Sequence, residues 1–325
     1  MIAGHDKAVE QFRSAWDSRA LHHAWLLAGP RGVGKAHFAR QAVRRLLSEA
    51  TGAPVDLEGL ETPAEHPMAK LIGAGSHPDL RWIERIENPK KPGTLYRDII
   101  IDQIREAGSF LSLAPALSSW RAVVIDSMDE LASAGANALL KMLEEPPPNT
   151  IFFLVTHAPG RLLPTIRSRC RRLQFEALGD DAMASILEKQ LPDTSPEERQ
   201  RLIPLADGSV GRALAFASLD LGPLERDALA ILRQGDPDNS KRSDLAGQLG
   251  RKAAADRYSA FLELLPSLVA REARTLVEPS RQRALDAYEQ VREVVAIAPR
   301  LSLDPAATVF QLGGILASVA GPRLS

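Results

Sequence analysis

One short segment contains residue types that could hold phosphate groups. "GPRGVGKA", which ends at Ala36, fits the pattern G-x-x-x-x-G-K-[ST] at every position except the last. In such a loop the backbone N–H groups surround the phosphates and the lysine, here Lys35, reaches the outer ones. We therefore predict that Gly29, Gly32, Gly34 and Lys35 contact a nucleotide. A plain glycine turn with a solvated lysine is the alternative.

Hydrolysis needs more than this loop. Magnesium is usually held by a Ser or Thr hydroxyl of the loop and by an Asp from a second strand. Ala36 supplies no hydroxyl, whereas Asp126 ends a predicted strand and could be that carboxylate, or else a cap or turn residue. The next residue, Ser127, is not an acid, and Asp129 and Glu130 should point elsewhere if a helix begins there. We expect ATP or ADP to bind weakly or without turnover.

These residues need a scaffold of alternating strands and helices. Helical patterns separate five short apolar runs, which we predict to be strands, at residues 24–29, 79–85, 121–126, 150–156 and 171–175. This alternation predicts an α/β fold, with a parallel sheet covered by helices on both faces. Strands that are buried on both sides show continuous apolar runs, as these do.

Beyond residue 175 the pattern is helical only. Short helices come first, and longer ones follow from about residue 221. We predict three parts: a nucleotide-binding-like α/β core over 1–176, a small helical lid over 177–220, and an all-α domain over 221–325. The longest predicted loop is 48–80, which is rich in Pro and Gly.

The composition excludes several classes of protein. The formal net charge is -1, so the chain as a whole has no electrostatic attraction to nucleic acid, although a local basic face remains open. The single cysteine, Cys170, excludes an internal disulfide and a cysteine-rich zinc site. No apolar segment approaches the roughly 20 residues that cross a membrane, and the N-terminal residues lack a signal-peptide core. We expect a cytoplasmic protein without a membrane partner.

Together these segments resemble the AAA+ clamp-loader family of bacterial DNA polymerase III. The most specific stretch, 136–175, contains "LLKMLEEPP", a sensor-type Thr156 and the "SRC" motif. "GSVGRAL", at 208–214, is similar to the lid motif that carries a sensor arginine, here Arg212. The resemblance implies an AAA+ core with a five-stranded parallel sheet, and it makes the 221–325 part a collar that joins subunits.

The "SRC" arginine, here Arg169, has a special role in the resembling family, where it reaches across a subunit interface to the γ-phosphate held by a neighbour. A guanidinium suits this role because it is always charged and grips phosphate oxygens in pairs. Such an arginine finger is worth on the order of 10³ to 10⁵ in rate. A surface arginine before a strand is the alternative, since "RSRCRR" offers four. We expect Cys170 to be a buried small residue and not a nucleophile.

Two departures from the family pattern bear on function. Subunits of this group often carry four zinc-binding cysteines after the first helix, whereas the corresponding stretch here has none. His66, His77 and Asp79 lack the number and spacing of a tetrahedral site, so no zinc is expected. Motor subunits of the family keep the loop hydroxyl and the acid. Their replacement by Ala36 and Ser127 points to a non-hydrolysing member.

The resemblance therefore implies a subunit that helps load the sliding clamp onto primed DNA, together with gamma/tau motor subunits and the delta subunit. Contacts to DNA should go to the backbone, through residues such as Lys90 and Lys91, because aromatic residues are 5% of the chain and form no stacking array. A motor subunit with its own ATPase activity is the main alternative. A small-molecule kinase lacks a visible acceptor site, and another AAA+ DNA remodeller would need an acid after Asp126.

Overall fold

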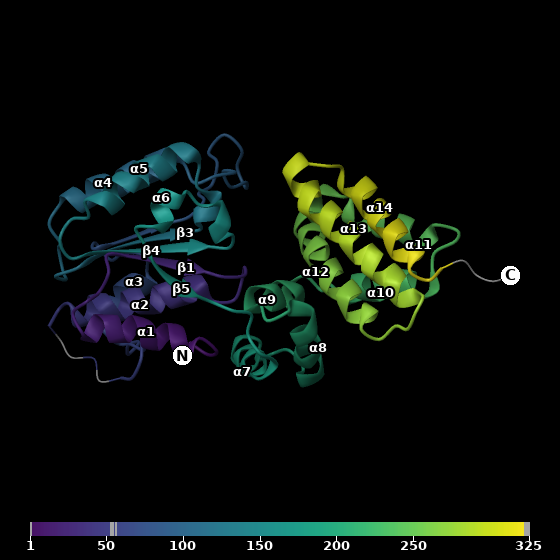
Figure 1. Ribbon diagram of the computed structural model, residues 1–325, viewed down its shortest axis with the longest axis horizontal. Helices are drawn as coiled ribbons and strands as arrows, with labels where there is room; N and C mark the ends of the chain where they lie inside the picture. The colour runs from purple at the N-terminus through teal and green to yellow at the C-terminus, as the bar shows by residue number, and fades with distance from the viewer. Residues whose placement is uncertain (1, 53–54, 56, 322–325) are drawn as a thin grey trace. The chain divides into compact units, whose positions relative to one another are not determined.

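The computed structural model describes residues 2–52, 55 and 57–321, and it forms two compact units, Met1–Leu178 and Gly179–Ser325. The first unit is α/β and the second is helical (Figure 1). Their border lies close to residue 176, where the α/β core was predicted to end. The division of the second unit into a lid over 177–220 and a collar over 221–325 stays a prediction.

A five-stranded parallel sheet, in the order β2-β3-β4-β1-β5, forms the centre of the first unit. Its strands are β1 (Ala24–Ala28), β2 (Leu80–Ile83), β3 (Arg121–Asp126), β4 (Thr150–Thr156) and β5 (Arg171–Gln174). The five predicted strands and their parallel pairing are confirmed. Every residue of β1 and β4 is buried, which explains why both appear in the sequence as unbroken apolar runs.

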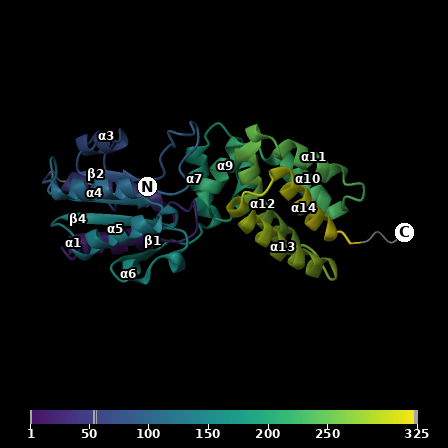
Figure 2. The same ribbon diagram turned by 90° about the horizontal axis from the view of Figure 1, so that it is seen from above.

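Helices cover both faces of this sheet, as predicted (Figures 1 and 2). On one face lie α1 (Asp6–Asp17), α2 (Lys35–Glu49) and α3 (Pro67–Gly73); on the other lie α4 (Ile101–Ser112), α5 (Ser133–Glu144) and α6 (Pro164–Arg167). Successive side chains of β1 alternate between the two layers. Trp25 packs into the cluster with α1 and α2, and Leu26 packs into the cluster with α4 and α5.

The predicted loop over 48–80 is not wholly irregular. It contains α3, whose first residue is a proline and whose N-cap is His66, where Nδ1 accepts a hydrogen bond from the backbone N–H of Met68 at 3.2 Å. The loop prediction was therefore wrong for this turn of helix, which is too short to produce a clear helical period. Residues 53, 54 and 56 of the predicted loop lie outside the described residues.

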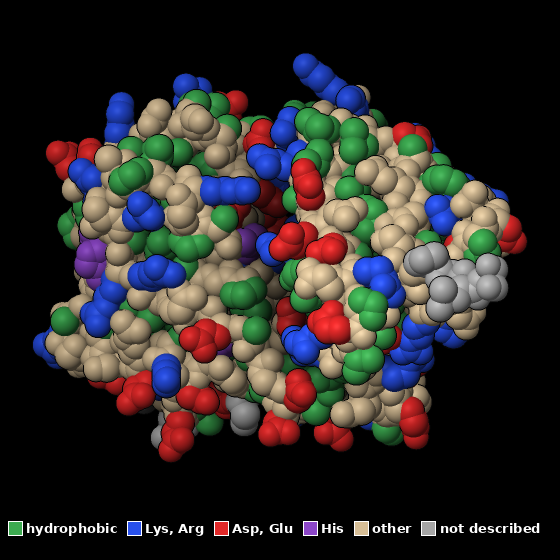
Figure 3. Space-filling view, turned by 45° about the vertical axis from the view of Figure 1, so that its right-hand side comes forward, with side chains coloured by type: hydrophobic (Ala, Val, Ile, Leu, Met, Phe, Trp, Pro, Cys, Tyr) green, Lys and Arg blue, Asp and Glu red, His purple; other side chains and the backbone are tan. Residues whose placement is uncertain are grey.

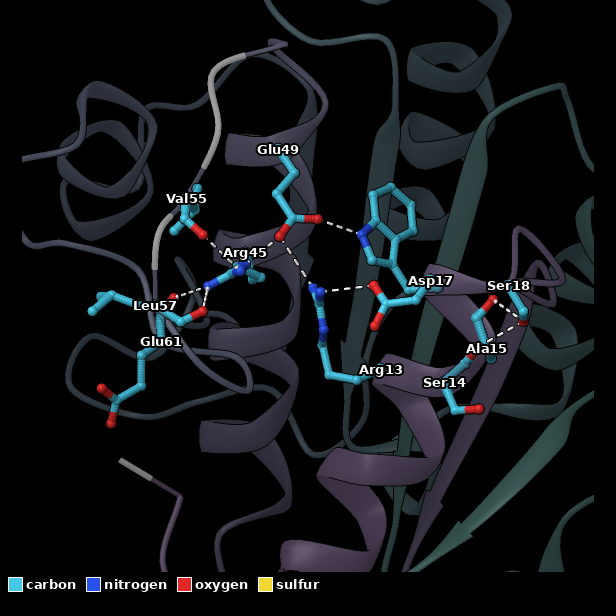
Figure 4. A network of polar contacts seen from close by, with 11 residues as sticks. Arg13, Ser14, Ala15, Asp17, Ser18, Arg45, Glu49, Val55, Leu57 and Glu61 are labelled. Atoms are coloured by element: carbon cyan, nitrogen blue, oxygen red, sulfur yellow. Dashed lines mark hydrogen bonds and ion pairs between the residues drawn. The ribbon is translucent and has the colours of Figure 1, made fainter.

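A buried arginine fixes the chain where it leaves α2 (Figure 4). Arg45 is 5% exposed and pairs with Glu49 one turn later. Its guanidinium also donates to the carbonyls of Val55, Leu57 and Glu61, at 2.9, 2.7 and 2.6 Å. Glu49 in turn accepts from Arg13 of α1 at 3.1 Å. Both helices and the following segment are thus tied together beside the sheet.

The second unit is formed by α7 (Asp180–Gln190), α8 (Pro196–Ala206), α9 (Val210–Ser218), α10 (Gly222–Gln234), α11 (Ser240–Leu249), α12 (Ala255–Ala273), α13 (Ser280–Leu301) and α14 (Pro305–Ser318). Residues 242–273, whose sequence is helical in pattern throughout, are divided by a 3₁₀ turn (Lys252–Ala254) between α11 and α12. The carboxylate of Glu225 in α10 is almost buried, and it pairs with Arg201 of α8 at 3.2 Å and Arg271 of α12 at 2.9 Å. None of the helices in the described part of the chain is long and apolar enough to cross a membrane.

Candidate functional site

The predicted phosphate loop joins β1 to α2 at the carboxyl end of the sheet. A Cβ atom on Gly29 would lie 2.1 Å from the carbonyl oxygen of Phe175, so no side chain fits there without a backbone shift. Gly32 and Gly34 have φ angles of +75° and +107°, which other residues rarely adopt. The glycines selected by the sequence pattern are therefore those that this backbone requires.

Lys35, the first residue of α2, lies inside the loop with 3% exposure. Its ammonium donates to the carbonyl of Gly29 at 2.7 Å and to that of Pro30. Burial lowers the pKa of Lys35 to about 8, against the attraction of Asp129 and Asp126. A phosphate oxygen near this ammonium would stabilise its charged form. The loop therefore has the backbone shape and the positive charge to receive phosphate.

The metal side of the site is incomplete. Asp126 ends β3, and burial together with Glu84 and Glu130 raises the pKa of its carboxyl. Ala36 offers no oxygen, and the hydroxyl of Ser127 is buried without a hydrogen-bond partner in the described structure. Within residues 2–52, 55 and 57–321, no group of three or more His, Cys, Asp and Glu side chains could hold a metal ion. The residues fit the phosphates of a nucleotide better than its magnesium.

Thr156 ends β4 and pairs in register with Ala28, directly before the loop. Its hydroxyl donates to Asp129 at 3.2 Å, and its oxygen accepts from the N–H of Ala158 at 3.2 Å. We expected Asp129 to point away from the site if a helix begins there. Instead the residue lies in a 3₁₀ turn (Met128–Glu130) and not on an α-helix, and its carboxylate is directed back toward β4.

Two histidines that no sequence motif identifies, His5 and His157, lie near the loop. His5, at the N-cap of α1, has Nε2 2.7 Å from the carbonyl oxygen of Val33 and packs edge-on against Phe175. Burial and the positive charge of Lys35 lower the pKa of His157 to about 4, so this ring is neutral at neutral pH. Its Nδ1 is buried without a hydrogen-bond partner among the described residues. The sequence does not reveal either role, because the surroundings of both rings depend on how distant segments fold together.

Arg169 lies between α6 and β5, at the surface of the first unit. Its guanidinium donates to the carbonyl of Thr165 at 2.9 Å and pairs with the carboxylate of Glu144 at 2.8 Å. The side chain is 35% exposed, so the charged group is held in place without being enclosed. Beside it, burial raises the pKa of Cys170 to about 12. The thiol therefore stays protonated, although Cys170 is only partly buried and not the fully buried residue that was predicted.

Arg212, the predicted lid sensor, is the third residue of α9 in the second unit. Its Nη1 lies 3.4 Å from the carbonyl of Ala206 and 3.4 Å from the hydroxyl of Ser267, and its Nε lies 4.0 Å from Glu263. These contacts hold α9 against α12. The sensor role of Arg212 stays a prediction.

The residues considered for a zinc site have other contacts. Asp79 is 2% exposed and accepts hydrogen bonds from the backbone N–H groups of residues 116, 117 and 118. Burial opposes ionisation, but these three donors hold the pKa of Asp79 below its ordinary value. His77 accepts from the N–H of Asp79 at 3.1 Å, and its other ring nitrogen lies 3.1 Å from the sulfur of Met68. Both residues thereby fix the entry to β2.

Comparison with known families identifies the first unit. A family model described as "DNA polymerase III, delta subunit" matches residues 4–179. The chain belongs to this family. The predicted resemblance to clamp-loader subunits is confirmed, and the five-stranded parallel sheet with helices on both faces confirms the predicted α/β fold.

Relatives from several bacteria fit this assignment. DNA polymerase III subunit delta' of Pseudomonas aeruginosa is 35% identical over 192 residues, which are 59% of this chain and 55% of the relative. DNA polymerase III subunit tau of Bacillus subtilis is 28% identical over 271 residues, 81% of this chain and 45% of the relative. The chain thus spans about half the length of the curated relatives it matches.

Solved structures are more distant. A DNA polymerase III gamma subunit-related protein from Thermotoga maritima is 18% identical, with a TM-score of 0.47 over 96% of this chain and 99% of that one.

Proposed function

We propose that this chain is a clamp-loader subunit of the delta-prime kind, which helps load the sliding clamp onto primed DNA. It works in the cytoplasm beside gamma/tau motor subunits and the delta subunit. It lends Arg169 to a nucleotide bound by a neighbouring ATPase subunit, and it hydrolyses little or no ATP itself. Family membership supports the clamp-loader role. The geometry of single residues supports the finger role of Arg169 and the lack of hydrolysis by this chain.

The observation that carries the proposal is the position of Arg169. A finger that acts on another subunit must be exposed, yet it must lose little freedom when it meets the phosphate. Arg169 meets both needs, because Glu144 and the carbonyl of Thr165 fix a guanidinium that is 35% exposed. On reaching a γ-phosphate it would stabilise the charge that develops during transfer. This contribution is on the order of 10³ to 10⁵ in rate.

The site's own residues support the proposed lack of turnover. Lys35 and the glycines can hold ATP or ADP. However, Ala36 has no hydroxyl to bind magnesium, and Ser127 has no carboxylate to polarise the attacking water. When bound, the nucleotide would bring its triphosphate and magnesium. Of this chain's own groups, Lys35 would neutralise phosphate charge and Asp126 would face the metal. No zinc is part of the proposal.

Contacts to primed DNA would be electrostatic and limited. Lys90 and Lys91 are exposed on a turn that Asn88 helps to form. On the face drawn in Figure 3, Lys and Arg side chains are interspersed with Asp and Glu side chains. Such a surface favours a few backbone contacts whose strength falls with salt. We further propose that the 177–220 lid carries Arg212 toward nucleotide and that the 221–325 collar joins the ring.

Substitution of the finger in a reconstituted clamp loader tests the proposal. The assembly would contain motor subunits, the delta subunit, the clamp and primed DNA. Arg169→Ala should lower clamp- and DNA-stimulated ATPase activity by about 10³-fold, with the same subunits still co-eluting. Arg167→Ala, which removes an exposed arginine two residues earlier, is the matched control and should change the rate less than about twofold. Normal ATPase activity with Arg169→Ala would refute the finger role.

A motor subunit with its own ATPase activity is the second candidate. It is favoured by the retention of Lys35 and Asp126 and by the similarity to subunit tau over 81% of the chain. The purified chain, mixed alone with Mg-ATP and primed DNA, separates the two. Ordinary enzymes turn over at about 1 to 10³ per second. Phosphate release at about 1 per second or faster would therefore support the interpretation as a motor subunit. Release indistinguishable from buffer would support the delta-prime kind.

A further inference from the structure

The hydroxyl of Thr156 is fully committed inside its own unit. Thr156 is 0% exposed. Its single proton goes to Oδ1 of Asp129 at 3.2 Å, and its oxygen already accepts from the N–H of Ala158. A hydroxyl has one proton to donate, so this one has none left for a phosphate oxygen. A lone pair directed at a phosphate would repel it.

Asp129 is well held in this position. Besides the Thr156 hydroxyl, its carboxylate accepts from the N–H of His157 at 2.6 Å and from that of Ala158 at 2.9 Å. These donors come from the end of β4, whereas Asp129 follows β3. The carboxylate therefore bridges the ends of two neighbouring strands.

We propose that Asp129 holds the Thr156 hydroxyl in a hydrogen bond and so prevents this hydroxyl from contacting the γ-phosphate. As a result, the phosphate loop binds ATP and ADP almost equally. This inference rests on one part of the proposed function, the ability of the loop to bind nucleotide. It does not depend on the finger role of Arg169. Asp129 is a positioning residue in this scheme, because it acts through Thr156.

The charge of Asp129 works in the same direction. It attracts the ammonium of Lys35, the group that would meet the outer phosphates. Other charged or titratable groups that interact with Lys35 or His157 in this region are Asp126, Arg31 and His5. A triphosphate places more negative charge near Asp129 than a diphosphate does. The carboxylate therefore disfavours ATP more than ADP, in addition to withholding the hydroxyl.

Removal of this carboxylate should be tolerated by the fold. The hydrogen bonds that it accepts from the N–H groups of His157 and Ala158 lie at the exposed surface, so water can replace Asp129 there. Thr156 would then be free to rotate its proton toward the loop. Asp129→Asn, which keeps the size and removes the charge, provides a second variant in case Asp129→Ala folds poorly.

The test compares dissociation constants of ATP and ADP, measured by calorimetry on the purified full chain. The wild-type ratio should lie within about threefold of unity, and Asp129→Ala should raise the preference for ATP about fivefold or more, as expected for one hydrogen bond to a charged oxygen. Asp129→Asn should shift it in the same direction. Glu130→Gln is the matched control. It removes a charge from the neighbouring residue, whose carboxylate pairs with Arg85, and should shift the ratio less than about twofold.

A double variant separates the hydroxyl from the charge. Adding Thr156→Val to Asp129→Ala should remove the part of the gain that comes from the hydroxyl and leave only the smaller part that comes from the lost charge of Asp129. An unchanged ratio in Asp129→Ala and Asp129→Asn, or a gain that Thr156→Val does not reduce, would overturn the proposal. So would a wild-type chain that already prefers ATP tenfold or more, roughly the effect of an intact hydrogen bond to a charged oxygen.

The result also distinguishes this proposal from the function proposed above. If neither the wild type nor the Asp129 variants bind nucleotide, Asp129 is not what limits the site and the inference fails. The Arg169 experiment remains informative in that case, because it measures hydrolysis of the ATP that is bound by a neighbouring subunit. If only the Asp129 variants bind nucleotide, the inference also fails, because the wild-type loop is proposed to hold both ATP and ADP.

Discussion

The guanidinium of Arg169 lies 2.8 Å from the carboxylate of Glu144, and the two residues come from different elements. Glu144 ends α5, whereas Arg169 follows α6. Both belong to the stretch whose sequence most resembles clamp-loader subunits, but the sequence does not reveal that they meet. The ion pair gives the proposed finger a defined resting position at the surface.

Loss of Glu144 should weaken the finger without abolishing it. In the reconstituted assembly, Glu144→Ala should lower stimulated ATPase activity about threefold to tenfold, because a half-exposed ion pair is worth about 1 kcal/mol and the contact with Thr165 remains. Glu144→Gln keeps a neutral acceptor and should recover part of the rate. Glu145→Ala is the control. A loss as large as that of Arg169→Ala would mean that Glu144 does more than position the arginine.

Gly29 should be intolerant of any side chain. Gly29→Ala would bring a Cβ atom within 2.1 Å of the Phe175 carbonyl, and we expect it to lower the free energy of unfolding by about 2 to 4 kcal/mol in urea titrations. Gly73→Ala, at the end of α3, meets no atom within 4 Å and should change it by less than about 0.5 kcal/mol. Equal effects of the two variants would contradict the close approach.

Burial of Lys35 should make stability depend on pH in the alkaline range. Its pKa is about 8 in the folded chain, against 10.5 ordinarily, so between these values the unfolded chain binds more protons and stability rises with pH. At pH 7 the full cost of the buried charge is present. Lys35→Met should then be more stable than the wild type by about 1 to 3 kcal/mol, and this advantage should shrink toward pH 10. Urea titrations at the two pH values provide the measurement, and a constant difference would contradict the shift.

The same lysine should matter little to the neighbour's chemistry. In the reconstituted assembly, Lys35→Ala should change stimulated ATPase activity far less than Arg169→Ala does, because the hydrolysed nucleotide belongs to another subunit. Phosphate release under identical conditions compares the two variants. Complete loss of activity with Lys35→Ala would show that nucleotide in this chain's own loop is required.

His157 should destabilise the fold in acid. Its pKa is about 4 when folded and 6.5 ordinarily, so the unfolded chain takes up the proton first as pH falls through this window. The stability contributed by the neutral ring is present above pH 6.5 and is lost toward pH 4. Between these values the wild type should lose about 1 to 2 kcal/mol more than His157→Gln, after allowance for its partial exposure. Parallel pH profiles of the two proteins would exclude this assignment.

Much of the first unit could be predicted because its signals are local. Residues 150–156 form an apolar run because β4 is buried on both faces, and that run is visible without any knowledge of its neighbours. Gly29, Gly34 and Lys35 form a motif within a single short loop. The short α3 was missed because a helix of 7 residues is too brief to show a period.

The sequence by itself determined the α/β class, the strand positions and the phosphate loop, because apolar periodicity and backbone geometry are properties of neighbouring residues. Only the tertiary structure decided that Asp129 holds Thr156, that His5 reaches Val33 across 28 residues, and that Glu144 holds Arg169. These contacts depend on which strands lie side by side and on how one turn is wound. No spacing along the chain encodes that arrangement, so it appears only when distant segments pack together.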